Sequence, residues 1–194
     1  MGRWERRLRC AAAERRAPCV RMKIWTVGHS THSLEAFVEL LTENGIALLA
    51  DIRTVPKSRR HPHFDTDALA LSLPDHGLAY LHLPRLGGWR RAAADSPNGA
   101  WRNDSFRGYA DYAMGDEFAG GLAQLRELGA TQPVAMMCSE ALWWRCHRRL
   151  VADRLVVAGD TVCHIGSDGR ASPHRLASFA AVTADGQLTY PGAP

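Results

Sequence analysis

The sequence lacks the features that mark several special classes of protein. No apolar run approaches the roughly 20 residues that a membrane-spanning helix needs, and we expect no membrane partner. The five cysteines include no C-x-x-C pair and show no disulfide framework for a chain of 194 residues. No internal repeat and no linker divides the chain. These absences predict a single globular domain, and the unpaired cysteines predict a reducing, cytoplasmic location.

Net positive charge is also absent outside one segment. Seven arginines and two glutamates give residues 1–21 a net charge of +5, whereas the whole chain carries +4, so the remainder carries −1. The basic charge therefore does not predict that the whole domain binds nucleic acid. The segment has no apolar region of a secretory signal. We expect residues 1–21 to be a basic, disordered extension, or to precede a true start at Met22, and residues 22–194 to form one domain.

Short apolar runs alternate with amphipathic segments along the rest of the chain. The apolar runs predict five strands, at residues 23–28, 47–53, 78–83, 133–138 and 161–165. Helical patterns lie at residues 33–44, 65–73, 106–114, 118–128 and 139–158. This alternation predicts an α/β fold, a three-layer sandwich with a mostly parallel central sheet of about five strands. Beyond residue 172 we expect a helix and a hairpin at Asp185-Gly186.

Polar side chains collect where the predicted strands end. In chain order they are His29, Ser30, Asp51, Arg53, His82, Cys138, Glu140 and His164. Ligands of open parallel sheets bind outside the carboxyl ends of the strands. The pattern therefore predicts one pocket at this edge of the sheet.

Cys138 is the first candidate for chemistry in that pocket. The predicted helix places its thiol near a helix N-terminus, where a thiolate is stabilised and can act as a nucleophile or ligand. Free cysteines are also common in cores, and that alternative stays open. Glu140, His29 and Asp51 are the candidates for proton transfer. A glutamate in a first helical turn can equally serve the helix dipole alone.

The predicted helix argues against other sulfur chemistry. Eight helical residues would separate Cys138 from Cys146 by about 12 Å, whereas a disulfide needs Cα atoms within about 7 Å, so we expect Cys146 to pack in the core. The bulky, glycine-free loop between Cys138 and Arg145 disfavours an anion-cradling loop of the phosphatase or sulfurtransferase type. A metal is possible, since His29, Asp51, Cys138, Glu140 and His147 are legitimate ligand types. We assign none of them as a ligand, because the spacings match no zinc signature and His147 fits a partly exposed helical position.

Basic side chains gather after the second strand and in the last long helix. Pro56 and Pro62 bracket a basic loop. Guanidinium groups suit phosphate and carboxylate, although a run of charges is often a solvated surface. The predicted anion-binding residues are Ser30, Arg53, Lys57, Arg59, His147 and Arg148.

Several ordered motifs together resemble a known family. They are Thr26-Val-Gly-His29-Ser30, Asp51-Ile-Arg53 followed by Pro56-Lys-Ser58-Arg59, Leu83-Pro84 with Leu86-Gly87-Gly88, Cys138-x-Glu140, and Cys146-His147-Arg148 with His164-Ile165. Over residues 23–190 the chain is similar to the DUF488 family, whose name denotes a domain of unknown function. The resemblance implies a compact α/β domain with these residues gathered in one site, and it implies no reaction. Trp143 and Asp65 stand where the family pattern leads us to expect proline and asparagine.

The sequence supports three kinds of function. The first is an enzyme acting on a phosphate-bearing or otherwise anionic substrate, which includes nucleotides and nucleic acids, with thiol- or metal-dependent chemistry as a variant. The second is a non-catalytic nucleotide or nucleic-acid binder with Trp89 and Trp101 as stacking surfaces. The third is a protein-interaction module anchored by Trp143 and Trp144. The sequence defines neither a cofactor nor an oligomeric state.

Overall fold

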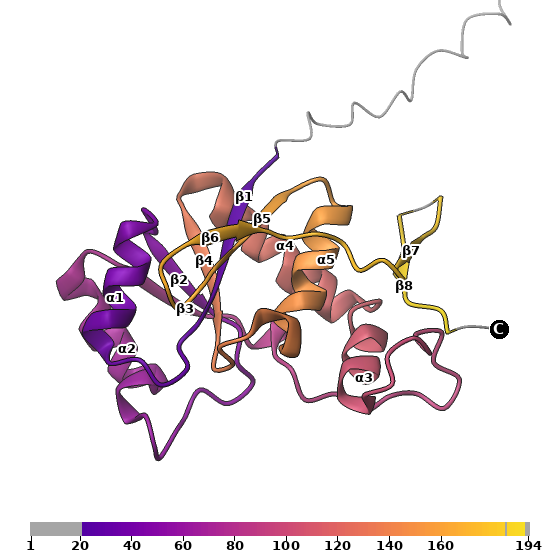
Figure 1. Ribbon diagram of the computed structural model, residues 1–194, viewed down its shortest axis with the longest axis horizontal. Coiled ribbons are helices and arrows are strands. Elements are labelled where there is room, and N and C mark those ends of the chain that lie inside the picture. The colour runs from indigo at the N-terminus through magenta and orange to yellow at the C-terminus, as the bar shows by residue number, and fades with distance from the viewer. Residues whose placement is uncertain (1–20, 185, 193–194) are drawn as a thin grey trace, which may run out of the picture.

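The computed structural model describes residues 21–184 and 186–192, so most of the predicted extension, and Asp185, lie outside it. A six-stranded sheet in the order β3-β2-β4-β1-β5-β6 forms the middle layer (Figure 1). Its strands are β1 (Lys23–Gly28), β2 (Leu48–Asp51), β3 (Ala79–His82), β4 (Val134–Cys138), β5 (Thr161–Ile165) and β6 (Ala171–Pro173). The first five are parallel and β6 is antiparallel. The predicted mostly parallel sheet is confirmed, with one further edge strand.

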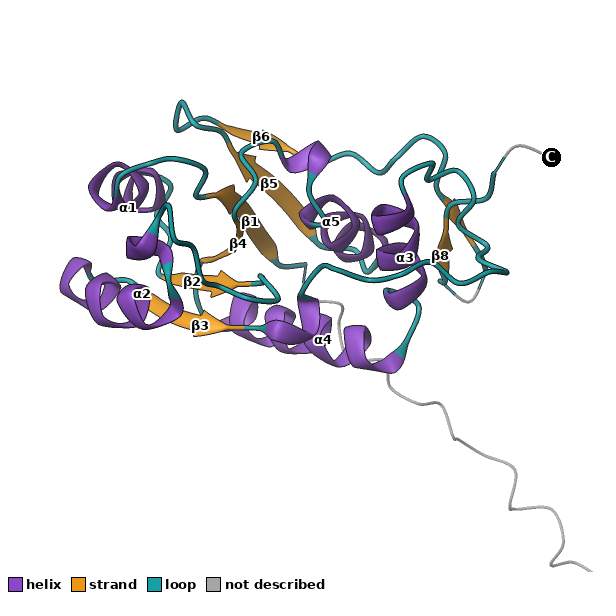
Figure 2. Cartoon of the chain, turned by 90° about the horizontal axis from the view of Figure 1, so that it is seen from below, coloured by secondary structure: helices purple, strands orange, loops and turns teal. Residues whose placement is uncertain are grey.

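Helices cover both faces of the sheet (Figure 2). The α-helices are α1 (Leu34–Glu43), α2 (Thr66–Ser72), α3 (Asp104–Tyr112), α4 (Asp116–Thr131) and α5 (Arg148–Val157). The 3-10 helices are η1 (Pro62–Phe64), η2 (Leu73–His76), η3 (Pro84–Leu86) and η4 (Trp143–Arg145). One face packs on α1 and α2 and the other on α4 and α5, with α3 beside α5, so the predicted three-layer sandwich is confirmed.

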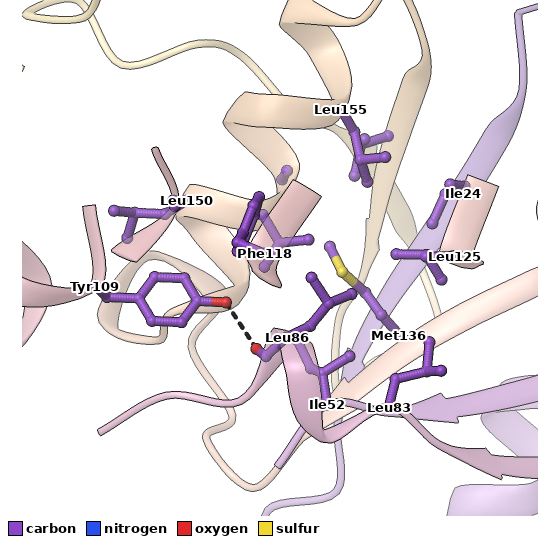
Figure 3. Packing of buried hydrophobic residues seen from close by; sticks show 14 of the residues in the cluster. Ile24, Ile52, Leu83, Leu86, Tyr109, Phe118, Leu125, Met136, Leu150 and Leu155 are labelled. Carbon is purple, nitrogen blue, oxygen red and sulfur yellow. Dashed lines mark hydrogen bonds between the residues drawn. The ribbon is translucent and has the colours of Figure 1, made fainter. Parts of the chain in front are cut away.

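The two faces of the sheet have separate cores because side chains alternate along each strand. In β4, Met136 packs toward α4 and α5, whereas Met137 packs toward α1 and α2. Figure 3 shows the first core, where Leu125 of α4 and Leu155 of α5 lie around Ile24 and Met136. Both faces of the central strands are therefore buried, as their continuous apolar runs indicate.

Short-range signals set the ends of α1. The Ser33 hydroxyl accepts a hydrogen bond from the backbone N–H of Ala36 at 3.3 Å, which is the expected N-cap. Asn44 forms the C-cap, and Gly45 follows with a left-handed φ of 67°. Asp65 precedes α2, but its carboxylate accepts from the backbone N–H of Ser58 at 2.7 Å instead of capping the helix. Asp65 therefore fixes the basic loop.

The prediction of a helix directly after Cys138 is wrong. Residues 139–142 form no helix, η4 follows, and α5 begins only at Arg148. Arg148 is 1% exposed, and its guanidinium group donates to the backbone carbonyls of Glu140 and Ala141. These contacts hold the segment in a turn, because the carbonyls are bound by a side chain and not by a helical N–H.

The C-terminal part contains the predicted hairpin, formed by β7 (Ala181–Val182) and β8 (Leu188–Thr189), but no helix among its described residues. It is fastened to α5 through the buried carboxylate of Asp153. His174 lies 2.8 Å from this carboxylate, and the Tyr190 hydroxyl donates to it at 2.8 Å. The hydrogen bonds substitute for regular structure in this segment.

Gly28 gives a test of the turn after β4. A Cβ atom at this position would overlap the carbonyl oxygen of Glu140. Gly28→Ala will therefore lower the free energy of unfolding by about 2 kcal/mol or more, because backbone must shift. Gly120→Ala, within α4, is the matched control and will raise it by up to about 1 kcal/mol. Urea denaturation measures both, and equal effects of the two variants would contradict this role of Gly28.

Candidate functional site

A pocket of about 550 Å³ opens where β1, β2 and β4 end. Of the predicted catalytic and anion-binding residues, those that line it are His29, Ser30, Arg53, Lys57, Cys138, Glu140 and His147. Asp51, Arg59 and Arg148 do not line it. The pocket lies at the carboxyl edge of the parallel strands, where ligands of such sheets bind.

Two thiols and an imidazole meet in the wall of this pocket. The Nδ1 atom of His147 lies 3.8 Å from the Cys138 sulfur and 3.7 Å from the Cys146 sulfur. All three atoms lie within 4.8 Å of one another. We call Cys138, Cys146 and His147 the thiol–imidazole cluster. The expected separation of the two cysteines is wrong, because the chain between them turns back and is not a helix.

The ring of His147 has a defined orientation. Its Nε2 atom lies 3.1 Å from the carbonyl oxygen of Ile52. A carbonyl only accepts hydrogen bonds, so Nε2 carries the proton and the lone pair of Nδ1 faces the two sulfur atoms. The cluster therefore presents three electron-pair donors to one point.

Arg148 lies beneath the cluster as a buried cation. Its Nε–H donates to the Cys146 sulfur at 3.4 Å, and no carboxylate among the described residues forms an ion pair with it. Burial opposes ionisation of Cys146, but the hydrogen bond with Cys138 and the charge of Arg148 outweigh it and lower the Cys146 pKa. The same Cys146 hydrogen bond, followed by burial, raises the pKa of Cys138. Negative charge thus favours Cys146, whereas the sequence drew attention to Cys138.

A second buried cation, Arg53, is held by Asp51. The guanidinium group donates to both carboxylate oxygens, with Nε to Oδ1 at 2.9 Å and NH2 to Oδ2 at 2.5 Å. The hydroxyl of Tyr80 donates to the same carboxylate at 2.8 Å. Asp51 is fully buried. Its carboxylate therefore orients Arg53 and does not itself reach the pocket.

His29 is neutral beside this ion pair. Burial, and next the charge of Arg53, lower its pKa to about 4. Its Nε2 lies 3.3 Å from Arg53 NH1, and its Nδ1 lies 3.0 Å from the carbonyl of Ser30, so Nδ1 carries the proton. The ring stacks on Phe64 with centroids 4.2 Å apart. His29 thus forms a fixed, uncharged wall.

The basic side chains differ in their relation to the pocket. Lys57 and Arg145 are exposed and line it, whereas Arg59 is exposed outside it. The sequence suggested Arg145 only as the closing residue of a phosphatase-type loop, which the spacing and bulk of that loop disfavoured, so it was not among the predicted anion-binding residues.

The tryptophans also differ in their exposure and in whether they line the pocket. Trp89 is 80% exposed and lines the pocket. Trp101 is 8% exposed and packs in the core against Phe106, so the expectation that it offers a stacking surface is wrong. Trp143 stacks on His164 with centroids 3.9 Å apart, whereas Trp144 is 48% exposed. The Trp143 ring thus anchors η4 to β5.

His82 and His164 follow the strand-end pattern but lie outside the pocket lining. His82 contacts the carbonyl of Arg53 at 2.8 Å. His164 belongs to a buried chain that joins Thr26 to His174 through contacts of 2.8 and 2.9 Å. Both histidines support elements of the fold.

Residues 33–155 match the family model described as "Domain of unknown function DUF488". The chain is a member of the DUF488 family. The matched range of this DUF488 chain includes the whole thiol–imidazole cluster and both Asp51 and Arg53. No curated protein and no solved structure matches the chain. Among the described residues of this DUF488 chain, no helix is long and apolar enough to cross a membrane.

The neutral histidines predict how stability depends on pH. Burial lowers the pKa of His29 to about 4, and burial with the charge of His174 lowers that of His164 to about 3, both from 6.5. Between pH 6.5 and 4 the unfolded chain therefore binds more protons than the DUF488 fold. The free energy of unfolding will fall as pH falls through this range, by up to about 1.4 kcal/mol per pH unit for each histidine.

Urea denaturation at several pH values checks this expectation. His164→Gln removes one titrating group, so the dependence on pH will become shallower than in the natural chain. A slope that is the same in both chains would contradict the assignment of His164 as a buried neutral histidine.

Proposed function

We propose that this chain is an enzyme that binds a phosphate-bearing or otherwise anionic substrate in the pocket and performs its chemistry at the thiol–imidazole cluster. One observation supports the proposal most. The cluster lies in the wall of the same pocket that Arg53, Lys57 and Arg145 line. Reactive sulfur and binding cations thus face one cavity.

Two of these cations are available to a substrate. Neither Lys57 nor Arg145 forms an ion pair with a carboxylate among the described residues. Both side chains are exposed where they line the pocket. An unpaired ammonium and guanidinium in a concave site attract anions and donate charge-assisted hydrogen bonds to them. The Ser30 side chain, also in the lining, adds a hydroxyl donor.

Other residues of the pocket lining supply groups for chemistry. Cys146 is the sulfur on which negative charge is favoured, and a thiolate acts as a nucleophile or as a metal ligand. The Glu140 side chain is exposed in the pocket lining, where it serves as the group for proton transfer. In this proposal Asp51 and Arg148 are positioning residues, since they hold Arg53 and Cys146.

Trp89 favours a nucleotide as the anionic substrate. Its indole is exposed at the pocket, whose lining also includes Lys57. An exposed aromatic ring stacks on a nucleobase, and stacking contributes about 1–3 kcal/mol for each base. The same feature suits a non-catalytic nucleotide binder, which differs by the absence of turnover.

Binding of inorganic pyrophosphate and AMP tests whether Lys57 and Arg145 bind anions. Lys57→Ala and Arg145→Ala will each raise Kd by about 5- to 30-fold, because each removes a charge-assisted contact. Arg170→Ala is the matched control, since its side chain is 90% exposed and outside the pocket, and will leave Kd unchanged. Isothermal titration calorimetry measures all three.

Failure of the natural chain to bind either anion, or an equal effect of Arg170→Ala, would contradict the anion site. Phosphate release from nucleoside mono-, di- and triphosphates then separates an enzyme from a binder. The enzyme predicts turnover that Cys146→Ser abolishes while pyrophosphate binding is kept.

A further inference from the structure

We infer that Cys138, Cys146 and His147 bind one zinc ion whose fourth coordination position opens to the pocket. This goes beyond the proposed function, because a zinc ion can bind there whether or not the pocket takes an anionic substrate. No metal ligand was assigned from the sequence, because the spacings match no zinc signature and His147 was expected on a partly exposed helix. That helix is not present, and the three side chains converge.

The distances within the cluster are close to those of a zinc site. Zinc bonds of about 2.3 Å to sulfur and about 2.0 Å to nitrogen place tetrahedral ligand atoms about 3.5–3.8 Å apart. The two sulfur-to-Nδ1 distances are 3.8 and 3.7 Å. The donor set also suits the metal, since two thiolates and one imidazole are typical zinc ligands.

Neighbouring groups already orient two of the ligands. His147 donates from Nε2 to the carbonyl of Ile52, which leaves Nδ1 as the metal-binding atom. The sulfur of Cys146 accepts a hydrogen bond from Arg148, as metal-bound thiolates commonly do. Gly88 keeps the imidazole uncrowded, because a Cβ atom there would stand 3.2 Å from Nδ1.

Charge gives the fourth position its preference. Two thiolates neutralise a divalent zinc ion, and the buried charge of Arg148 then remains without a carboxylate partner among the described residues. A buried charge is stable when it is compensated. An anionic fourth ligand, either hydroxide or an oxygen of an anionic substrate, supplies that compensation.

Three protein ligands with one open position are the pattern of catalytic zinc sites, whereas structural sites have four protein ligands. All three side chains line the pocket, so the fourth position faces solvent-accessible space. Among the described residues, no other His, Cys, Asp or Glu completes a second such cluster. The site is therefore open and single in this part of the chain.

Zinc titration of the reduced, chelator-treated full chain tests the inference. We expect about one zinc ion per chain, with a Kd below about 100 nM in competition with a chromogenic chelator. Co²⁺ in place of zinc will give sulfur-to-cobalt charge-transfer absorption and the visible bands of a tetrahedral site. Circular dichroism checks that every variant is folded.

Ligand variants locate the ion. Cys138→Ser, Cys146→Ser and His147→Gln will each weaken zinc binding by at least about 100-fold. Cys163→Ser, combined with Cys10→Ser and Cys19→Ser, is the matched control and will bind zinc like the natural chain. Gly88→Ala keeps all three ligands and will still weaken binding, because its methyl group crowds Nδ1; it serves if a ligand variant does not fold.

Absence of zinc binding by the reduced chain, or unchanged affinity in Cys146→Ser, overturns the inference. The inference is also overturned if Cys138 and Cys146 form a disulfide in the oxidised chain and the chain takes up no zinc once that disulfide is reduced. Lys57→Ala separates the two proposals, since it will leave zinc affinity unchanged. Zinc binding without anion binding would contradict the proposed function alone, and anion binding without zinc binding would contradict this inference alone.

Discussion

The rest of the site depends on the hydrogen bonds that the buried guanidinium group of Arg148 donates. Moving a cation out of water is unfavourable unless acceptors surround it. Here the acceptors are the carbonyls of Glu140 and Ala141 and the sulfur of Cys146. To provide them, the chain after β4 must turn back on itself. One cation thus sets both the course of the backbone and the position of a reactive sulfur.

Arg53 shows the same division between support and surface. Its partner Asp51 lies fully buried below it, and Tyr80 donates to that carboxylate from the next strand. Asp51 and Tyr80 therefore fix the orientation of the Arg53 side chain, which lines the pocket. Lys57 and Arg145 form no ion pair with a carboxylate among the described residues, and both remain exposed.

Much of the fold follows from local signals in the sequence. Continuous apolar runs located β1, β2 and β4, and Ser33 with Gly45 marked the ends of α1. The edge strand β6 gave no signal, because Ala171–Pro173 is a three-residue exposed segment without an apolar pattern. The segment 139–147 gave a misleading one, since its residues are compatible with a helix. Two contacts override that local preference for a helix. One is with Gly28, which is distant in the sequence, and the other is with Arg148, whose side chain is buried.

Part of the candidate site could also be predicted from the sequence. The rule that parallel strands end at one edge brought together His29, Arg53 and Cys138, which lie in the pocket lining. The proximity of Cys146 to Cys138 was not predictable, because it depends on the turn that the helix prediction missed. The adjacency of Cys146, His147 and Arg148 in one motif was the available signal.

We infer that the thiol–imidazole cluster and the cations Lys57 and Arg145 serve one ligand. Anomalous diffraction at the zinc edge, from crystals soaked in zinc and pyrophosphate, tests it most directly. We expect a zinc peak bonded to Cys138, Cys146 and His147, with a pyrophosphate oxygen at or beside its fourth position and the anion in contact with Lys57 and Arg145. No peak at the three side chains, with pyrophosphate bound elsewhere on the chain, would contradict it.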